Sequence, residues 1–444
     1  MEPVAQPDET AGTGNLPADG SAAMRQLKSG AVSLVDQGLV SAANFMTGVF
    51  VGRFCGKEQM GLYMLGMTVL FMSMNFQQSL LNMPYMVFCP RHKGRELKLF
   101  SGSVALLQLA LALGLALVVL ATGFGVGAFP GFEQLRPILW TVSCILVFFL
   151  FRDFARQMNF ARFRFQASLG MDSLALVAQF AIIGVLLAMG RLSAVNVFFA
   201  LGLSAGLAGM FWFWRTRRDF VVDGSRLGAD LAFVWRFGRW PLLAGVVLIL
   251  TNQCYPWFLN GYHGAGATGE LAAVMGVVNV MNPFIIGVGN YLGPRLMHIM
   301  ALEGKGAMAS FTLKSCLFLA ACMALLCLVM FLAGDYFIRL IYGQDYSGLG
   351  MLVGLVCVAQ AADVVSFPFR GGILALERPE ALYKVNMIQL GVIIALALAL
   401  IPSMGKTGVG LCMVLGNGVA LLFRIGIYYK VLGGSERHGN LLRQ

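Results

Sequence analysis

The chain contains apolar runs that are too long for the interior of a soluble protein. The stretch "SVALLQLALALGLALVVLATGFGVGAF", residues 103–129, has no charged residue. About 20 mostly apolar residues cross the hydrocarbon core of a bilayer as a helix, so such runs predict membrane spans. The ten-residue alternation typical of an outer-membrane barrel is missing, and the expected fold is therefore all-α.

The composition agrees with a polytopic membrane protein. Hydrophobic residues make up 58% of the sequence and charged residues 12%, whereas soluble domains have about a quarter charged residues. Short connections leave room for twelve spans. We expect them at about 31–51, 61–86, 99–122, 135–151, 166–189, 193–214, 240–260, 270–297, 309–332, 347–369, 382–402 and 406–429.

The longest polar break divides these spans into two groups of six. It reads "RTRRDFVVDGSRLGADLAFVWRFGR". The expected organisation is a disordered cytoplasmic tail (1–30), an N-terminal six-helix lobe (31–214), a cytoplasmic linker (215–239), a C-terminal six-helix lobe (240–430) and a cytoplasmic tail (431–444). The first 23 residues contain four acidic residues and no Lys or Arg, which is unlike the basic start of a signal peptide.

The two lobes show a weak internal repeat at a shift of 208 residues. Six identities occur in 39 positions, pairing Asn44 with Asn252, Phe50 with Phe258, Gly56 with Gly264, Gly61 with Gly269, Met67 with Met275 and Asn82 with Asn290. An even number of spans in each half keeps the orientation of the repeats parallel. We therefore expect two lobes related by an axis normal to the membrane, with a central cavity between them.

The distribution of basic residues along the sequence predicts how the chain is oriented in the membrane. With the N-terminus in the cytoplasm, only six of the 32 Lys and Arg residues fall in outer loops, namely Arg53, Lys57, Arg136, Arg191, Arg339 and Lys406. Short cytoplasmic loops carry an excess of Lys and Arg, so both termini are predicted to be cytoplasmic. This bias also explains the net charge of +11 without a nucleic-acid partner.

Four arginines follow the fourth span in "FRDFARQMNFARFRF", at Arg152, Arg156, Arg162 and Arg164. Two interpretations remain open. Arginines and aromatic residues are ordinary anchors at the membrane interface. Alternatively, the forked guanidinium groups help to gather a lipid diphosphate at the cytoplasmic mouth.

Polar amides recur inside two spans. Asn75, Gln78 and Asn82 in span two, and Asn279, Asn282 and Asn290 in span eight, have a spacing that places each set on one helical face. They form either a wall suited to sugars or hydrogen bonds between helices. Pro283 removes a backbone donor, which predicts a kink near Asn279.

Charged residues inside spans are fewer. Asp36, Asp363, Arg370 and Arg424 all lie toward the predicted cytoplasmic ends. A buried carboxylate in a transporter is a candidate proton or sodium site, or part of a gate that pairs with arginine in one state. The alternatives are static ion pairs between helices and, for Arg424, an extended side chain that reaches the interface.

Other ligand chemistry has little support in the sequence. The four histidines are scattered without metal-ligand spacing, and the nine cysteines lie almost entirely inside spans. We expect no metal site, no cofactor and no disulfide framework. A membrane enzyme would need converging acids, bases or nucleophiles on a sizeable surface segment, and the outer loops are short, so the chain is not expected to be an enzyme.

Several segments together resemble Wzx-type polysaccharide repeat-unit flippases of the multidrug/oligosaccharidyl-lipid/polysaccharide exporter superfamily. They are "GRFCGKEQMGLY", repeated as "GYHGAGATGELAA", then "VMGVVNVMNPFIIGVGNYLGPRL" in span eight and "FRDFARQMNFARFRF" after span four. The resemblance covers roughly residues 25–430.

The resemblance implies an inner-membrane protein with a V-shaped cavity and alternating access. Such flippases carry an undecaprenyl-diphosphate-linked oligosaccharide to the periplasmic leaflet for exopolysaccharide, capsule or O-antigen synthesis. It further implies possible coupling to protons or sodium, and a polysaccharide polymerase and chain-length regulator as possible partners. The alternative within the superfamily is a multidrug antiporter that exchanges a cationic drug for a cation. A lipid II flippase would typically have two more spans.

Overall fold

The computed structural model describes residues 20–126, 129 and 132–441, and these residues contain helices and no strand. The all-α prediction is confirmed. The helices are α1 (Gly20–Cys55), α2 (Lys57–Gln77), α3 (Met83–Phe88), α4 (Gly94–Val126), α5 (Leu135–Ala161), α6 (Phe165–Ala188), α7 (Ala194–Thr216), α8 (Gly224–Val278), α9 (Asn282–Leu302), α10 (Gly304–Tyr342), α11 (Gly350–Val365), α12 (Phe367–Ala375) and α13 (Pro379–Leu441). Short π or 3-10 turns occupy Gln78–Asn82, Cys89–Arg91, Arg217–Asp219, Asn279–Met281 and Gln344–Tyr346.

The number of helices agrees with the twelve predicted spans. Within the described residues, nine helical segments are long and apolar enough to cross a membrane. Two of them, Gly224–Leu302 and Pro379–Gly433, each contain two predicted spans, which meet at Gly264 and Gly405, where the backbone is not helical. The remaining predicted span is formed by α2 and α3.

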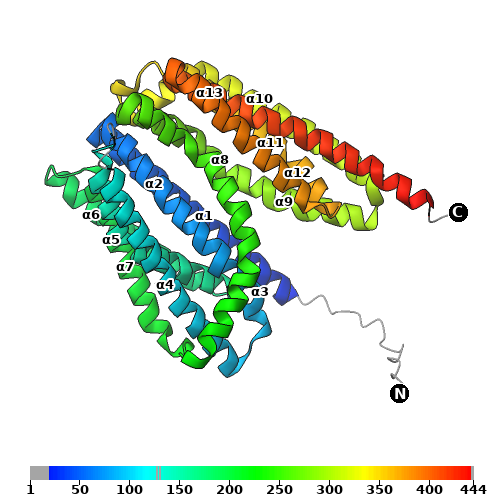
Figure 1. Ribbon diagram of the computed structural model, residues 1–444, viewed down its shortest axis with the longest axis horizontal. Helices are drawn as coiled ribbons and strands as arrows, with labels where there is room; N and C mark the ends of the chain where they lie inside the picture. Colours follow the sequence, from blue (N-terminus) through cyan, green and yellow to red (C-terminus); the bar gives the residue numbers. More distant parts are fainter. Residues whose placement is uncertain (1–19, 127–128, 130–131, 442–444) are drawn as a thin grey trace.

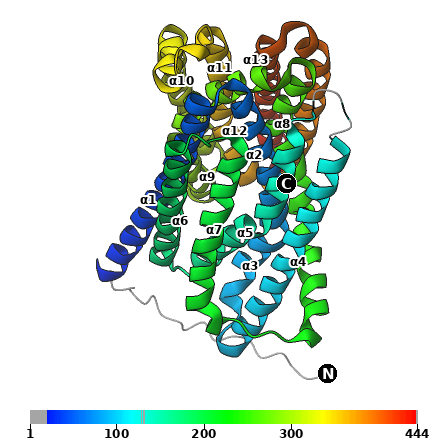
Figure 2. The same cartoon turned by 90° about the vertical axis from the view of Figure 1, so that its left-hand side faces the viewer.

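The helices form two bundles (Figure 1). One contains α1–α7 and the start of α8, and the other contains α9–α13 with the rest of α8, where Tyr255 and Leu259 pack against α13. The bundles lie close together at the end where Gly56, Gly264 and Gly405 turn the chain, which we call the glycine end. They diverge toward the opposite end, which we call the basic end and which is the predicted cytoplasmic side. Figure 2 shows α3 near the basic end and the tip of α10 at the glycine end.

The predicted linker between the lobes is not an extended loop. Most of 215–239 is helical, because α7 continues to Thr216 and α8 begins at Gly224. The start of α8 packs on the N-terminal bundle, where the Phe88 ring lies 4.5 Å from that of Phe233 and 5.3 Å from that of Phe237, centroid to centroid. These aromatic contacts hold the start of span seven against the first lobe, so α8 belongs to both lobes.

The predicted tails are also shorter than expected. Residues 1–19 and 442–444 lie outside the described residues. The described part of 1–30 is helical from Gly20, and α13 continues to Leu441. The helices therefore extend beyond the apolar spans at both ends of the chain.

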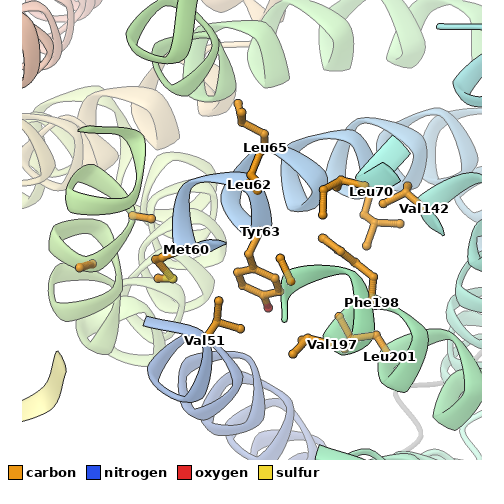
Figure 3. Close-up of a cluster of buried hydrophobic side chains, with 14 of the residues drawn as sticks. Val51, Met60, Leu62, Tyr63, Leu65, Leu70, Val142, Val197, Phe198 and Leu201 are labelled. Atoms are coloured by element: carbon orange, nitrogen blue, oxygen red, sulfur yellow. The ribbon is translucent and has the colours of Figure 1, made fainter. Parts of the chain in front are cut away.

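The largest apolar core lies near the glycine end, where α1, α2, α5 and α7 meet (Figure 3). The Tyr63 and Phe198 rings lie 5.4 Å apart, and Val51 and Leu65 are fully buried in the same cluster. This cluster continues into α8, α10 and α11 of the second bundle. Apolar packing thus joins the two lobes at this end.

Candidate functional site

The two lobes touch backbone to backbone where α2 crosses the second half of α8. A Cβ added to Gly61 would collide with the Ala265 carbonyl oxygen, and one added to Gly269 would collide with the Lys57 carbonyl oxygen. The shift of 208 residues relates Gly61 to Gly269 and Lys57 to Ala265. The two contacts are therefore the same contact viewed from each helix, as a two-fold relation between the lobes requires.

The glycines that precede this crossing also correspond. Gly56 has φ 85° and ψ 174°, and Gly264 has φ 79° and ψ 179°. Positive φ favours glycine, since it has no Cβ. The weak sequence repeat thus marks equivalent turns in the two lobes.

Polar contacts reinforce the glycine end. Arg53 Nη1 donates to the carbonyl oxygen of Leu340 at 3.3 Å, and the Tyr346 hydroxyl donates to the Gly52 carbonyl oxygen at 3.2 Å. Among the described residues, every hydrogen bond between residues 20–219 and helices α9–α13 with their connecting turns is made here. The lobes are accordingly joined at the glycine end.

A shared carboxylate adds an ionic contact to this end. Glu270 of α8 accepts from Lys57 Nζ at 2.6 Å and from Lys406 Nζ at 2.5 Å, and it is largely buried. Lys57 belongs to the first lobe and Lys406 to the second. Glu270 was not predicted from the sequence. The signal that could have found it is its position next to Gly269, one of the repeated glycines.

A central cavity of about 280 Å³ lies between the lobes. Its wall comes from α1, α2, α8, the turn after α8, α9 and α10, and it includes methionines, aromatic rings and the uncharged polar residues Ser41, Asn44, Thr68, Gln253, Asn279 and Asn282. No acidic or basic side chain lines this cavity. The side chains of Asn44, Gln253 and Asn279 have no hydrogen-bond partner among the described residues, so their donors and acceptors are available to a ligand.

The predicted amide faces are only partly present. Asn279 and Asn282 reach the cavity wall, next to the 3-10 turn that interrupts the helix before Pro283, which confirms the predicted kink. Asn290 is exposed on α9 and does not line the cavity. The substrate-binding role of these residues stays a prediction.

In span two, none of the three amides lines the central cavity. Asn75 lies against Gly245 of α8, Gln78 is exposed, and Asn82 points into the first lobe. The predicted common face assumed an α-helix throughout, but residues Gln78–Asn82 form a π-helical turn. A π turn has more residues than an α turn and rotates the following side chains around the axis.

The first lobe contains a buried ionic network. Arg156 of α5 donates to Asp36 of α1 at 2.8 Å and pairs with Asp172 of α6 at 3.0 Å. Arg152 donates to Asp172 at 2.6 and 3.1 Å. The side chains of Asp36 and Asp172 are completely buried. Arg152 and Arg156 lie inside the lobe and not in a loop, because α5 continues to Ala161. Their role at a cytoplasmic mouth stays a prediction.

A third carboxylate of this lobe was missed. Asp153 accepts from the Gln77 side chain at 3.2 Å and from that of Asn82 at 3.1 Å. It lines a small cavity of about 80 Å³, whose wall also includes Asn44 and Gln179. Because Arg152 and Arg156 line the same cavity, we count Asp153 with this network, which then has three carboxylates and two guanidinium groups. The signal in the sequence was an Asp directly beside Arg152 inside an apolar helix.

The other two predicted mouth arginines lie at the turn between α5 and α6. Arg162 donates to the Asp219 carboxylate at 2.7 Å, the Tyr85 hydroxyl at 3.0 Å and the Ser101 hydroxyl at 2.7 Å. Arg164 donates to Asp219 at 2.8 Å. Both guanidinium groups are thus engaged by a carboxylate, and an anionic headgroup would compete with Asp219 for them.

The connection between α7 and α8 is also held by an ion pair. Arg226 at the start of α8 pairs with Glu96 of α4 at 2.8 Å. Asp223 accepts from the hydroxyl and the backbone N–H of Ser225, at 2.6 and 3.0 Å. These hydrogen bonds hold the pKa of the Asp223 carboxyl below its usual value. The carboxylate in turn caps the first turn of α8.

The second lobe has a network centred on Arg424, which is 2% exposed. Its guanidinium donates to Asp363 at 3.2 Å, Ser366 at 2.8 Å, Asn386 at 3.2 Å and Gln389 at 3.4 Å. Arg370 also donates to Asp363 at 3.2 Å. The structure thus brings together Asp363, Arg370 and Arg424, which the sequence analysis had singled out separately.

Comparison with solved structures shows which known folds this architecture resembles. No protein-family model and no curated protein matches the sequence. An inward-facing multidrug resistance MATE family transporter of the MOP superfamily has a TM-score of 0.72, at 15% identity, over 89% of this chain and 95% of that one. The chain has the same fold as this transporter. The lipid II flippase MurJ, in an inward closed conformation, has a TM-score of 0.68 at 11% identity over 90% of this chain and 89% of that one.

An outward-facing MATE family structure of the MOP superfamily gives a TM-score of 0.54, at 12% identity, over 91% of this chain and 94% of that one. These solved structures, which share the fold of this chain, are transporters, including a flippase. Together with the apolar helices, they show a multi-pass membrane protein.

Proposed function

We propose that this protein is an inner-membrane flippase for undecaprenyl-diphosphate-linked oligosaccharides. The observation that carries the proposal is the uncharged wall of the central cavity, with unpartnered amides at Asn44, Gln253 and Asn279. Sugar hydroxyls both donate and accept hydrogen bonds, and an amide offers both partners. A sugar headgroup loses its water on entering hydrocarbon, so a polar cavity removes much of that cost.

Alternating access is the proposed mechanism. The hydrogen bonds between residues 20–219 and helices α9–α13 lie at the glycine end, which we place on the periplasmic side because basic residues gather at the other end. The higher TM-score with an inward-facing MATE structure than with an outward-facing one supports a cavity accessible from the cytoplasm. Opening the glycine end would then release the headgroup to the periplasmic leaflet.

Ion coupling is proposed for the network of the first lobe. Its three carboxylates outnumber its two arginines, and Asp153 has neutral amides as its hydrogen-bond partners. A proton or a sodium ion would balance this charge and alter the packing of α1, α5 and α6. A polysaccharide polymerase and a chain-length regulator are the proposed partners that receive the translocated unit.

The second candidate is a multidrug antiporter of the same superfamily. The observation that favours it is Asp153, because this carboxylate lines a cavity that lies beside Asn44 of the central one. A cationic drug would need such a carboxylate. The central wall itself offers a cation no acidic side chain, which is why we prefer a sugar-bearing substrate.

Deletion of the gene in the native host tests the proposal. We expect undecaprenyl-diphosphate oligosaccharide to accumulate in extracted lipids while surface polysaccharide is lost, and the plasmid-borne gene to restore both. Unchanged polysaccharide with new sensitivity to cationic dyes would instead support the antiporter. Mass spectrometry of the lipid extract would also identify the sugar.

A further inference from the structure

An apolar groove of about 420 Å³ lies between α2 and α8, next to the central cavity. Its wall contains Thr68, Val69, Met72, Ile249, Leu250, Gln253, Cys254, Trp257 and Phe258. Two of these residues, Thr68 and Gln253, also line the cavity. The groove and the cavity are therefore neighbouring spaces with a shared polar border.

The groove lies between two close approaches of span two to α8. Toward the basic end, a Cβ on Gly245 would lie 2.6 Å from Asn75 Oδ1 and one on Gly238 would lie 2.7 Å from the Ser79 carbonyl oxygen. Toward the glycine end, Gly61 and Gly269 cross. The groove is thus a window at the level of residues 68–72 of α2 and 249–258 of α8.

The chemistry of the window changes from outside to inside. Met72 and Leu250 are 37% and 38% exposed, on a surface that faces lipid in a membrane protein. The remaining apolar residues form the walls, and the polar groups lie at the border with the cavity. A hydrocarbon chain matches the walls, and a polar group attached to it would reach the border.

Trp257 closes that border in this structure. Its indole Nε1–H donates to the Thr68 hydroxyl at 2.9 Å, which links α8 to α2. A molecule with a polar head in the cavity and a tail in the groove would pass Thr68, which lines both spaces and accepts this hydrogen bond. Breaking the hydrogen bond would free both side chains at this border.

We infer that the groove binds the isoprenoid chain of the transported lipid while the sugars occupy the central cavity. This inference rests on the proposed function. Continuity with the cavity favours the chain of the substrate over an unrelated phospholipid, because head and tail belong to one molecule. The Trp257–Thr68 contact is then the point at which the lipid enters.

Photo-cross-linking in living cells tests the site. p-Benzoylphenylalanine replaces Leu250 in the groove, Met275 in the cavity wall, or Leu332 on α10, which is 77% exposed and serves as the lipid-facing control. Mass spectrometry of the adducts should find isoprenoid diphosphates at Leu250 and Met275 and phospholipids at Leu332. Isoprenoid adducts at Met275 with only phospholipids at Leu250 would contradict binding of the isoprenoid chain in the groove and leave the proposed function intact. Their absence at both positions would overturn both.

A variant with a blocked groove gives an independent test. Leu250→Trp fills the window, whereas Leu332→Trp adds the same ring to the lipid-facing surface. We expect Leu250→Trp to accumulate lipid-linked oligosaccharide and lose surface polymer, with the control unaffected at equal expression. Normal polymer levels in Leu250→Trp would contradict the inference. Trp257→Phe removes the indole donor, and we expect it to increase the isoprenoid adduct at Leu250.

Discussion

Gly61 of α2 and Gly269 of α8 each lie against the backbone of the other helix, and the shift of 208 residues exchanges them. This reciprocal contact fixes the axis between the two lobes. It also makes the crossing intolerant of side chains, because the atoms that a Cβ would meet are carbonyl oxygens of the main chain.

Gly61→Val should destabilise the closed glycine end. Overpacking a tight contact costs about 1–3 kcal/mol. We expect a lower melting temperature in detergent and faster maleimide labelling of Cys55, which is half-buried at this end, in a background without the other cysteines. Gly114→Ala is the control, because nothing lies within 4 Å of its added Cβ. Equal labelling in both variants would show that the crossing does not keep the lobes closed.

Glu270→Gln should also loosen the glycine end, by a different route. The change removes the carboxylate that Lys57 and Lys406 share and leaves two ammonium groups near each other. Loss of a buried ionic partner costs about 3–5 kcal/mol, and the partial exposure of the lysines reduces this value. Faster Cys55 labelling is expected, and Glu58→Gln, an exposed residue without an ion pair, should leave it unchanged. Labelling that stays slow in Glu270→Gln would contradict a gating role.

Asp153→Asn tests coupling in the first lobe. The amide keeps the size of the side chain and one acceptor for Gln77 or Asn82, but it cannot bind a proton or ionise. We expect normal folding, with transport that no longer responds to a proton or sodium gradient. Asp345→Asn, in an exposed turn, is the control. Gradient dependence that persists in Asp153→Asn would exclude this carboxylate as the coupling site.

Arg424→Ala should lower the stability of the second lobe. Removing this guanidinium leaves Asp363, Asn386 and Gln389 without their shared donor. Loss of a buried ionic partner costs about 3–5 kcal/mol, and the partial exposure of Asp363 and its remaining pair with Arg370 reduce this value. Arg378→Ala, whose side chain is 62% exposed, should change the stability by less than about 0.5 kcal/mol. Thermal unfolding of the purified variants measures both. Similar melting temperatures would mean that the Arg424 network does not support the lobe.

Asn279→Leu and Asn282→Leu test the sugar-binding wall. Each lost hydrogen bond is worth about 0.5–1.5 kcal/mol, so each change should lower the apparent affinity for the lipid-linked sugar roughly 2- to 10-fold. Asn290→Leu removes an amide outside the cavity and should have no effect. Complementation of the deletion strain at low expression compares the three. An equal defect in all three would point to packing and not to the cavity.

The sequence by itself determined the helical class, the twelve spans, the equivalent turns at Gly56 and Gly264, and the break before Pro283. These features depend on hydropathy along the chain and on the backbone preferences of Gly and Pro, which are local. The helical periodicity of the sequence did not predict where the Asn82 side chain points, because Asn82 lies in a π turn and not in an α-helix.

Only the tertiary structure decided which polar groups meet. Arg156 and Asp36 are 120 residues apart in sequence, and Lys57 and Glu270 are 213 residues apart. Their pairing depends on how helices distant in sequence are placed, which no local pattern reports. The same holds for the cavity wall and the adjoining groove, since both are spaces between α2 and α8 that exist once the lobes cross.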